Sequence, residues 1–499
     1  MEFISGEDRE QTILFPPTVN EYVNENSAVR VIDAFINSLD LEALKFKRWE
    51  TKKTGRPPYD PKDILKLYVY GYMNRLRSSR RLEAESKRNL EVLWLLRNLS
   101  PDHKTIAIFR KDNPKALKNV FRSFVKLCIK LDLYGKELAA IDGSKFKAVN
   151  SKDNNFTRDK LKDRLERIDK KINEYLSELE QTDREEDIAE KEKSAAEINQ
   201  IIKDLKERKG KYEEYSEELQ KTGETQKSLT DAESRLMLAN GKMDVCYNVQ
   251  TAVDSKNKLI IEFDVTDKAN DMNQLTPMAE KVQDILETQT IAITADAGYA
   301  SVSDIAAAIQ IGVDPHVSGT DYDICIPVKD GEQIEITSHT NGRCVYLKER
   351  NIAICPMGKI LYPAFYKKKK GEAVFCNSEA CKACACRCTK GKSAFRYQFV
   401  MKETDFKEEY NDEELLVKQV HIKPDKEIYK QRKSLSEHPF GTVKRAMDGG
   451  YCLTKGKQKT TGEFALIFLA YNLKRVINIL GIRKLLENME IMGNIPCSV

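Results

Sequence analysis

No segment of this sequence is long and apolar enough to cross a membrane. The longest uninterrupted apolar run extends only from Phe464 to Tyr471, whereas a membrane-spanning helix needs about 18 or more such residues. The N-terminal residues from Met1 to Asp8 include neither the positively charged start nor the apolar centre of a secretory signal. We therefore expect no membrane partner and a cytoplasmic location.

Histidine is scarce and the net charge is small. The 5 histidines are too scattered to predict a His-based catalytic or metal centre: His103, His316, His339, His421 and His438. Lys and Arg total 83 against 78 Asp and Glu, a net charge of +5, so the overall balance indicates no particular partner. The distribution is more informative, because residues 43–82, 365–400 and 418–459 carry a positive surplus.

The length and composition allow several domains. With 499 residues, 41% of them hydrophobic, the chain can form about three domains and a sizeable core. We predict the following division: a helical domain at 1–130, core segments at 131–156 and 226–312, inserts at 157–225 and 313–415, and a last core segment at 416–499.

The N-terminal region has a helical pattern with basic ends. Asp60 and Pro61 form a helix start signal, which Ser100 and Pro101 repeat. Short basic helices suit a helix-turn-helix-like DNA-binding unit. The alternative is a plain helical bundle with solvated Lys and Arg. The arginines that we assign to DNA contacts are Arg56, Arg75, Arg77, Arg80 and Arg81.

From Glu137 onward the hydrophobic pattern becomes that of β-strands. The segments that read as strands are 138–149, 243–253, 259–265 and 290–295. A helical pattern follows at 303–311. Strands combined with helices in this way predict an α/β core.

The insert at 157–225 is highly charged and carries heptad-like spacing. Apolar residues recur every three or four positions in two stretches: Leu161, Leu165, Ile168, Ile172, Tyr175 and Leu179, then Ile198, Ile201, Leu205, Tyr212, Tyr215 and Leu219. This spacing predicts an antiparallel coiled-coil hairpin. Its role is open between dimerisation, clamping of DNA and a purely structural protrusion.

The second insert is rich in cysteine. Of the 12 cysteines, a cluster comprises Cys376, Cys381, Cys384, Cys386 and Cys388. In a reducing compartment such residues are read as thiols or metal ligands rather than disulfides. The Cys381-x-x-Cys384 spacing suits a structural tetrahedral zinc site, which Cys376 and Cys388 would complete. The alternative is a reduced, Cys-rich surface segment.

Three carboxylates that are remote in sequence are candidates for one site. Asp142 and Asp296 each follow a short apolar run typical of a buried strand, and Glu437 is flanked by cations beside a helical pattern. Mg²⁺ prefers oxygen ligands, and two or three carboxylates with substrate phosphate can hold a pair of ions. We predict a two-metal site for nucleic acid. Each acid also has a simpler explanation, as a turn residue, a strand-end cap or an ion-pair partner.

These acids and their surroundings resemble the DDE transposases of bacterial insertion sequences, in particular the group with an N-terminal basic helical domain and a Cys-containing insert before the catalytic Glu. The segments that carry the resemblance occur in one order: Thr54–Asp60, Asp142–Ser144, Tyr247–Asp254, Ala295–Ser301 and Glu437–Lys444. The resemblance implies a ribonuclease H-like core. It places the first Asp on strand one, the second near the end of strand four and the Glu on a later helix.

The family pattern around the last acid maps onto this sequence with one departure. The matching residues are Tyr429, Arg432, Glu437 and Lys444. Four residues separate Arg432 from Glu437, where the common pattern has three, and Pro439 disfavours a regular helix at this point. Glu427 is the nearest rival for Glu437, but it lacks the following Phe-Gly and Lys.

The resemblance also implies the reaction and the partners. The implied activity is DNA cleavage at the ends of the element and strand transfer into target DNA, with two Mg²⁺ or Mn²⁺ ions held by Asp142, Asp296 and Glu437. Arg432 and Lys444 would contact phosphates, and Tyr429 would contact DNA or simply pack. The implied partners are double-stranded DNA at the nucleoid and further copies of the chain, in a homodimer or larger assembly. The alternatives are a metal-dependent endonuclease without strand transfer and a DNA-binding protein with vestigial acids.

Overall fold

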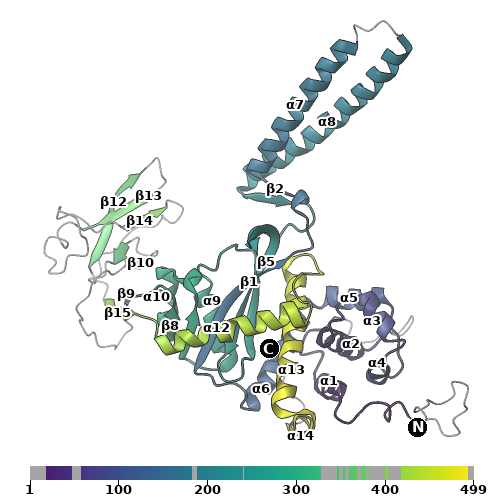
Figure 1. Ribbon diagram of the computed structural model, residues 1–499. Helices are drawn as coiled ribbons and strands as arrows, with labels where there is room; N and C mark the ends of the chain where they lie inside the picture. The colour runs from purple at the N-terminus through teal and green to yellow at the C-terminus, as the bar shows by residue number, and fades with distance from the viewer. Residues whose placement is uncertain are drawn as a thin grey trace, which may run out of the picture.

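The computed structural model has a mixed α/β fold, in agreement with the predicted fold class (Figure 1). The structure describes residues 18–47, 58–182, 188–239, 241–327, 345–347, 352–354, 359–367, 372–377, 380, 399–402 and 417–492. The helices are α1 (Ala28–Asn37), α2 (Pro61–Met73), α3 (Ser79–Glu85), α4 (Leu90–Leu95), α5 (His103–Asp112), α6 (Pro114–Lys130), α7 (Arg158–Thr182), α8 (Ile188–Thr222), α9 (Leu275–Leu286), α10 (Val302–Gln310), α12 (Lys426–Gly441), α13 (Lys457–Leu480) and α14 (Ile482–Met492). The strands are β1 (Leu138–Lys147), β2 (Asn155–Thr157), β3 (Gln226–Ser228), β4 (Arg235–Ala239), β5 (Lys242–Asp254), β6 (Ile260–Thr266), β7 (Ile291–Ala295), β8 (Val313–Val317), β9 (Tyr322–Pro327), β10 (Val345–Leu347), β11 (Ile352–Ile354), β12 (Ile360–Lys367), β13 (Glu372–Cys376), β14 (Phe399–Lys402) and β15 (Val417–Ile422).

A mixed six-stranded sheet forms the centre of the fold. Its order is β4-β5-β1-β7-β8, and β6 also pairs with β5. β1 runs antiparallel to β5, whereas β7 runs parallel to both β1 and β8. β7 pairs with the first half of β1, from Leu138 to Ala140, so the residue that follows the end of β7 lies beside the middle of β1.

Helices α12 and α13 pack on one face of this sheet through aromatic side chains. Phe146 of β1 lies 6.0 Å from Phe440 and 4.7 Å from Phe464, measured between ring centroids. The apolar start of β1 is buried together with Leu435 of α12. In Figure 1, α12 crosses the sheet in front of β1. This packing fixes the helix that carries the predicted third acid.

The N-terminal helices share the core of the sheet and do not form a separate body. One continuous cluster of buried apolar residues extends from α1 to α13 and includes β1, β5 and β6. On α6, Phe121 packs edge-on against Phe263 of β6 at 5.2 Å, and Arg122 Nε donates to Glu262 at 2.6 Å. The predicted division after residue 130 therefore crosses a continuous hydrophobic core.

A buried ion pair joins the N-terminal helices to α13. Arg77, which is 3% exposed, donates from Nη2 to Glu463 at 2.6 Å and to the Tyr451 carbonyl at 2.5 Å. Glu463 is fully buried, and its carboxylate also accepts from the N–H groups of Leu453 and Thr454. The predicted role of Arg77 as a DNA contact is therefore wrong, because its guanidinium is committed inside the fold.

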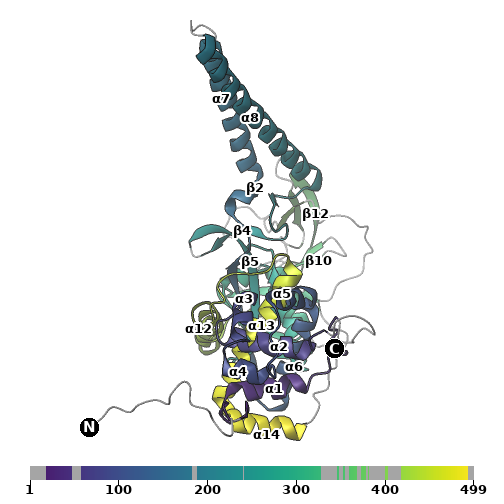
Figure 2. The same ribbon diagram turned by 90° about the vertical axis from the view of Figure 1, so that its right-hand side faces the viewer.

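The first insert is a long helical hairpin that projects away from the sheet (Figure 2). α7 and α8 pack against each other, and at their base Phe156 is buried with Leu161 and Leu219. Ile202 is buried at 6% exposure, whereas Ile201 is 39% exposed. The predicted apolar face of α8 is therefore wrong by one position at Ile201. The residue that shares the buried face with Ile198 is Ile202, four positions further along the helix. A coiled-coil geometry stays a prediction.

The second insert begins later than predicted. β8 lies within the range assigned to the insert, yet it pairs with β7 in the central sheet. The core therefore continues to Val317. β9 follows it at the start of the insert and pairs with β15, with which the chain returns to the core. The other described strands of this insert form a separate sheet, β10-β11-β12-β13-β14, whereas β2 and β3 pair with each other at the first insert. Cys376 ends β13, whereas Cys381, Cys384 and Cys388 lie outside the described residues, so the zinc site stays a prediction.

The helix start signals are confirmed in one case and displaced in the other. Asp60 caps α2, and its carboxylate accepts from the Lys62 N–H at 2.8 Å. α5 is capped by Asp102 rather than by Ser100, because the Asp102 carboxylate accepts from the N–H groups of Lys104 and Thr105.

Within the described ranges, no single helix has the length and apolar character needed to span a membrane. α13 and α14 meet those criteria only as a pair, and that pair is bent by 103°. Most apolar side chains of α13 are buried in the core.

The buried position of Arg77 predicts a loss of stability on substitution. Arg77→Met leaves the Glu463 carboxylate buried without its cation, and breaking a buried pair in this way costs about 3–5 kcal/mol. We expect urea denaturation to show a decrease of this size in the free energy of unfolding. Arg80→Met is the matched control, because Arg80 is exposed and an exposed substitution changes stability by about 0.5 kcal/mol or less. Equal effects of the two substitutions would contradict the assignment.

Candidate active site

Asp142 and Asp296 lie at the same edge of the central sheet. Asp142 is within β1, and Asp296 directly follows β7. The parallel register matches Ala140 with Thr294. Two residues further along each strand, the same register brings Asp142 beside Asp296. The structure therefore brings together two of the three acids that the sequence singles out.

The surroundings of Asp142 make its ionisation difficult. Burial and, after it, the negative charge of Asp296 raise the pKa of this carboxyl group, which lies at about 6. Stabilising contacts act in the opposite direction: Ser436 and Arg432 on α12 lower the pKa, as does the Gly143 N–H, which donates to Asp142 Oδ1 at 2.9 Å. The balance leaves a carboxylate that a neighbouring cation would stabilise.

Asp296 is held by the short turn that follows it. It caps the 3₁₀ turn η2 (Ala297–Tyr299), and its Oδ1 accepts from the Gly298 N–H at 2.8 Å. A Cβ atom on Gly298 would lie 2.9 Å from this same oxygen. Glycine therefore provides the space that the turn needs, which gives the Asp-Ala-Gly sequence a structural reason.

Glu437 is not gathered with the two aspartates. Its side chain is exposed, whereas the adjacent Ser436 is fully buried and faces Asp142. Within the described ranges, no three His, Cys, Asp or Glu side chains lie close enough together to hold a metal ion. The rival Glu427 is in the first turn of α12, in an exposed ion pair with Lys430 at 2.6 Å.

The four-residue gap before Glu437 explains this orientation. Arg432 and Ser436 are four positions apart, so they share the face of α12 that is turned towards the sheet. Each further residue is rotated by about 100° around the helix, which turns Glu437 away from that face. With the three-residue gap of the common pattern, the acid would occupy the position of Ser436.

Pro439 does not end α12, contrary to the expectation from the sequence. The helix continues through Pro439 to Gly441, and a π-helical turn, η5 (Thr442–Ala446), follows directly. Pro439 and Phe440 are buried. Burial of these side chains offsets the cost of a proline inside a helix, and the widened turn accommodates the change in backbone bonding.

Two cations of the predicted signature lie beside the aspartates. Lys444 Nζ donates to Ser144 Oγ at 2.7 Å and to the Lys145 carbonyl at 3.2 Å. Burial lowers the pKa of Lys444, and Asp142 partly offsets this effect. Arg432 lies over the ring of Tyr429, with its guanidinium carbon 5.5 Å from the centroid, and its buried Nε makes no hydrogen bond to the described residues.

The remaining predicted DNA contacts divide into three groups. Arg75, Arg80 and Arg81 are exposed, as a phosphate contact requires. Arg77 is buried, as described above, and Arg56 lies outside the described residues.

Asp271 is a neighbouring acid that the sequence reasoning missed. It lies between β6 and α9, and it accepts from Asn248 Nδ2 and Gln250 Nε2, each at 2.7 Å. Burial raises the pKa of Tyr299, and the charge of Asp271 raises it further, together with those of Asp142 and Asp296. Asp271 lies five positions after the end of β6, whereas Asp267 follows the strand directly, so reasoning from the strand end would have selected Asp267 instead.

The pKa of Asp142 predicts a dependence of stability on pH. Because the pKa of Asp142 in the folded protein lies above 3.8, the ordinary value for an aspartate, ionisation opposes folding, and stability is lost as the pH rises from about 4 to about 6. In metal-free buffer at pH 7, Asp142→Asn should raise the free energy of unfolding by about 1–3 kcal/mol. Urea denaturation at pH 7 and at pH 4 measures the difference in the free energy of unfolding between the variant and the parent. This difference should be smaller at pH 4.

Asp264→Asn is the control for this measurement. Asp264 is paired with Lys281 at 2.7 Å, and this pairing lowers its pKa, so its replacement should not stabilise the protein at pH 7. The prediction fails if the gain in the free energy of unfolding of Asp142→Asn over the parent is no larger at pH 7 than at pH 4. Ionisation of the Asp142 carboxyl group would then not oppose folding.

Comparison with known proteins agrees with the motifs. The family described as Transposase domain (DUF772) matches residues 17–112, and the family described as Transposase DDE domain matches residues 354–477. Glu437 lies inside the second match, whereas Asp142 and Asp296 lie outside both. No curated protein matches the chain.

One solved structure is similar over most of the chain. The cryo-EM structure of the piggyBac transposase synaptic complex with hairpin DNA matches with 9% identity and a TM-score of 0.31, over 94% of this chain and 80% of that one. A TM-score of this size does not establish a shared fold. The two family matches, one in the N-terminal helices and one around Glu437, are both to transposase domains, and they support a DDE-type transposase of an insertion-sequence family that acts in DNA transposition.

Proposed function

We propose that this transposase cleaves DNA at the ends of its insertion sequence and joins the freed 3′ ends to target DNA, using a pair of divalent metal ions. Asp142, Asp296 and Glu437 would be the metal ligands. The observation that carries the proposal is the adjacency of Asp142 and Asp296 at one sheet edge. The pairing of β1 with antiparallel β5 and parallel β7 supports a ribonuclease H-like core.

The donor set at the sheet edge fits Mg²⁺ or Mn²⁺. Both ions favour oxygen ligands, and two carboxylates that repel each other are stabilised by a cation between them. Bound ions would lower the pKa of a water molecule and neutralise charge on the phosphate. Glu437 is the third ligand that we assign, and its side chain has to reach across the edge of α12 to join the aspartates.

Lys444 and Arg432 would position the DNA backbone at these acids. The ammonium group of Lys444 is fixed to β1 through Ser144 and the Lys145 carbonyl, so it adds a positive charge at a defined place. The guanidinium of Arg432 is supported by the Tyr429 ring and can donate two parallel hydrogen bonds to a phosphate. Both side chains would hold the scissile strand while the chemistry takes place.

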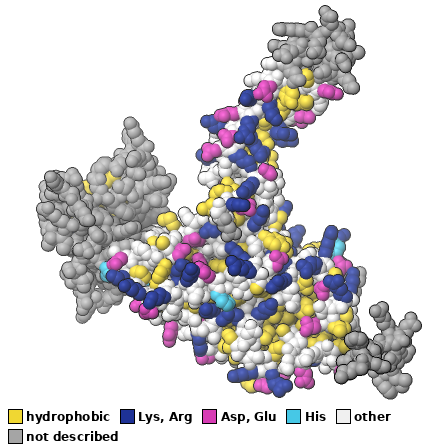
Figure 3. Space-filling view, viewed as in Figure 1, with side chains coloured by type: hydrophobic (Ala, Val, Ile, Leu, Met, Phe, Trp, Pro, Cys, Tyr) yellow, Lys and Arg dark blue, Asp and Glu magenta, His cyan; other side chains and the backbone are white. Residues whose placement is uncertain are grey.

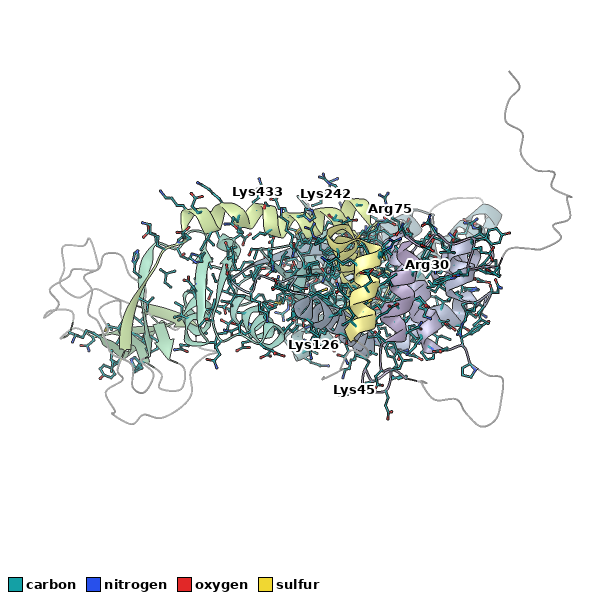
Figure 4. The ribbon with its side chains drawn as sticks, turned by 90° about the horizontal axis from the view of Figure 1, so that it is seen from below. Arg30, Lys45, Arg75, Lys126, Lys242 and Lys433 are labelled. Carbon is teal, nitrogen blue, oxygen red and sulfur yellow. The ribbon has the colours of Figure 1, made fainter. Side chains whose placement is uncertain are left out.

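Exposed cations extend the proposed DNA surface beyond the site. Lys433, Lys242 and Arg75 lie along the side of the molecule that carries α12 (Figure 4). Further Lys side chains gather at the end of α12 nearest β8 (Figure 3); these include the exposed Lys423, Lys426 and Lys430. Duplex DNA carries a dense row of phosphate charges, and a basic face of this extent would contact several of them.

Strand transfer of two element ends requires two active sites, so we further propose a homodimer or larger assembly on DNA. The α7–α8 hairpin extends well beyond the core (Figure 2). It is the segment that could reach a second copy or the DNA without obstructing the sheet edge.

Substitution of the aspartates tests the proposed chemistry. Asp142→Asn and Asp296→Asn should each lower the rate of cleavage of element-end DNA by about two orders of magnitude or more, because transition-state charge is no longer neutralised. Gel assays with Mg²⁺ or Mn²⁺ measure cleavage, and the appearance of joined products distinguishes strand transfer from simple nuclease activity. DNA affinity should be unchanged.

The same assay tests Glu437. Glu437→Gln should behave like the aspartate substitutions, whereas Glu427→Gln, which removes an exposed ion-pair partner on the same helix, should leave cleavage unchanged. Parental cleavage rates for Asp142→Asn and Asp296→Asn would exclude these carboxylates as ligands.

A further inference from the structure

Asp271 forms a compact polar cluster on the face of β1 opposite Asp142. Its side chain is 15% exposed and pairs with Lys145 Nζ at 3.2 Å. Asn248 and Gln250 of β5 donate to Asp271 Oδ1 as well. The register places Lys145 across from Asn248, and side chains alternate between the faces of a strand. The cluster is therefore separated from Asp142 only by the backbone of β1.

Gly143 makes this close approach to β1 possible. A Cβ atom at this position would lie 2.3 Å from Asp271 Oδ1 and 2.4 Å from Gln250 Nε2. Real Cβ atoms do not approach other heavy atoms so closely, so any side chain would displace Asp271 or Gln250. The glycine of the Asp142-Gly-Ser motif therefore has a steric role beyond that of a turn.

A hydrogen-bonded relay connects Asp271 to the turn that holds Asp296. The amide of Gln250 donates to Asp271 from Nε2 and accepts from the Tyr299 hydroxyl at Oε1. Because Asp271 only accepts when ionised, it fixes the orientation of that amide. Tyr299 is buried and ends the η2 turn that Asp296 caps. The orientation of the Asp296 carboxylate thus depends on a group on the other side of the sheet.

The same cluster controls a nearby cation. Lys145 is three residues from Asp142 in β1 and is largely buried. Its ammonium group is paired with Asp271, so its charge is already neutralised. Without Asp271, that ammonium group would be an unpaired positive charge on the opposite face of the strand that carries Asp142, and such a charge would weaken the binding of cations at the aspartates.

We propose that Asp271 is a positioning residue of the active site, which orients the Asp296 turn through Gln250 and Tyr299 and neutralises the positive charge of Lys145 near the two aspartates. This inference rests on the proposed function, because it assigns the support of the metal-binding carboxylates. Asp271 itself is not proposed as a metal ligand. Its role is to keep both aspartates free and correctly oriented for the cations.

Metal binding in the absence of DNA provides the primary test. We expect Asp271→Asn to weaken Mn²⁺ binding by about tenfold, the size typical for loss of a group that supports a metal ligand. Electron paramagnetic resonance of free Mn²⁺, titrated with the full-length protein, measures this directly. Cleavage of element-end DNA at limiting Mg²⁺ should decrease as well and recover in part at high Mg²⁺.

A double variant separates the two actions of Asp271 and guards against a folding defect. Lys145→Met combined with Asp271→Asn removes the ion pair without leaving an unpaired charge, so Mn²⁺ affinity should return towards the parental value. Asp264→Asn is the matched control, because it removes the acid of another Lys pair, on β6, and should leave Mn²⁺ binding unchanged. Thermal unfolding of every variant checks that it is folded.

The possible outcomes distinguish this inference from the proposed function. If Asp271→Asn binds Mn²⁺ and cleaves DNA like the parent while Asp142→Asn does neither, the role of Asp271 is refuted and the active site stands. If Asp142→Asn also keeps parental Mn²⁺ binding and cleavage, the proposed function itself fails. A double variant that binds Mn²⁺ no better than Asp271→Asn would refute the part assigned to Lys145.

Discussion

The structure depends on the close approach of two carboxylates, Asp142 and Asp296, at one edge of the central sheet. Parallel pairing of β1 with β7 places them side by side, and burial together with mutual repulsion makes ionisation of Asp142 costly. Such a pair persists only if the surrounding fold holds it in place. The long strand β5, the aromatic contacts of Phe146 and the turn after Asp296 provide that support.

The rest of the molecule stiffens this edge from several directions. The N-terminal helices are not an independent module, because α6 packs on β6 and the Arg77–Glu463 pair joins the α2–α3 loop to α13. The exposed Arg75 of that loop, and Arg80 and Arg81 in α3, are therefore held at a fixed position relative to the aspartates. For a protein that acts on DNA, this rigid connection would keep the cations that contact the backbone in register with the catalytic edge.

Helix α12 brings a second set of groups to the site and shows how helical geometry constrains them. One face supplies Arg432 and Ser436 to Asp142, while Glu437 is turned to the exterior. The π-helical turn that follows Pro439 interrupts the regular spacing just before Lys444. π-helical turns inside helices occur frequently at functional sites.

Much of this protein could be predicted from the sequence because it depends on local patterns. Apolar runs identified β1, β5, β6 and β7, the Asp60–Pro61 signal identified the start of α2, and the order of the motifs indicated the family that the two family matches support. Asp142 and Asp296 were recognised because each follows a short apolar run, although the structure shows that β1 continues past Asp142 to Lys147, whereas β7 ends directly before Asp296.

Other features depend on residues that are distant in sequence, and only the tertiary structure decided them. A basic segment has the same composition whether its arginines are exposed or buried, so the partner of Arg77 on α13 could not be anticipated. The role of β8 depends on pairing with β7, and the proximity of Asp271 depends on a glycine more than a hundred residues earlier. By itself the sequence determined which acids follow strands and which segments form helices, because short-range periodicity controls both. The direction in which Glu437, Arg77 and Asp271 point was decided by packing, because burial and charge pairing depend on what the folded chain places beside each side chain.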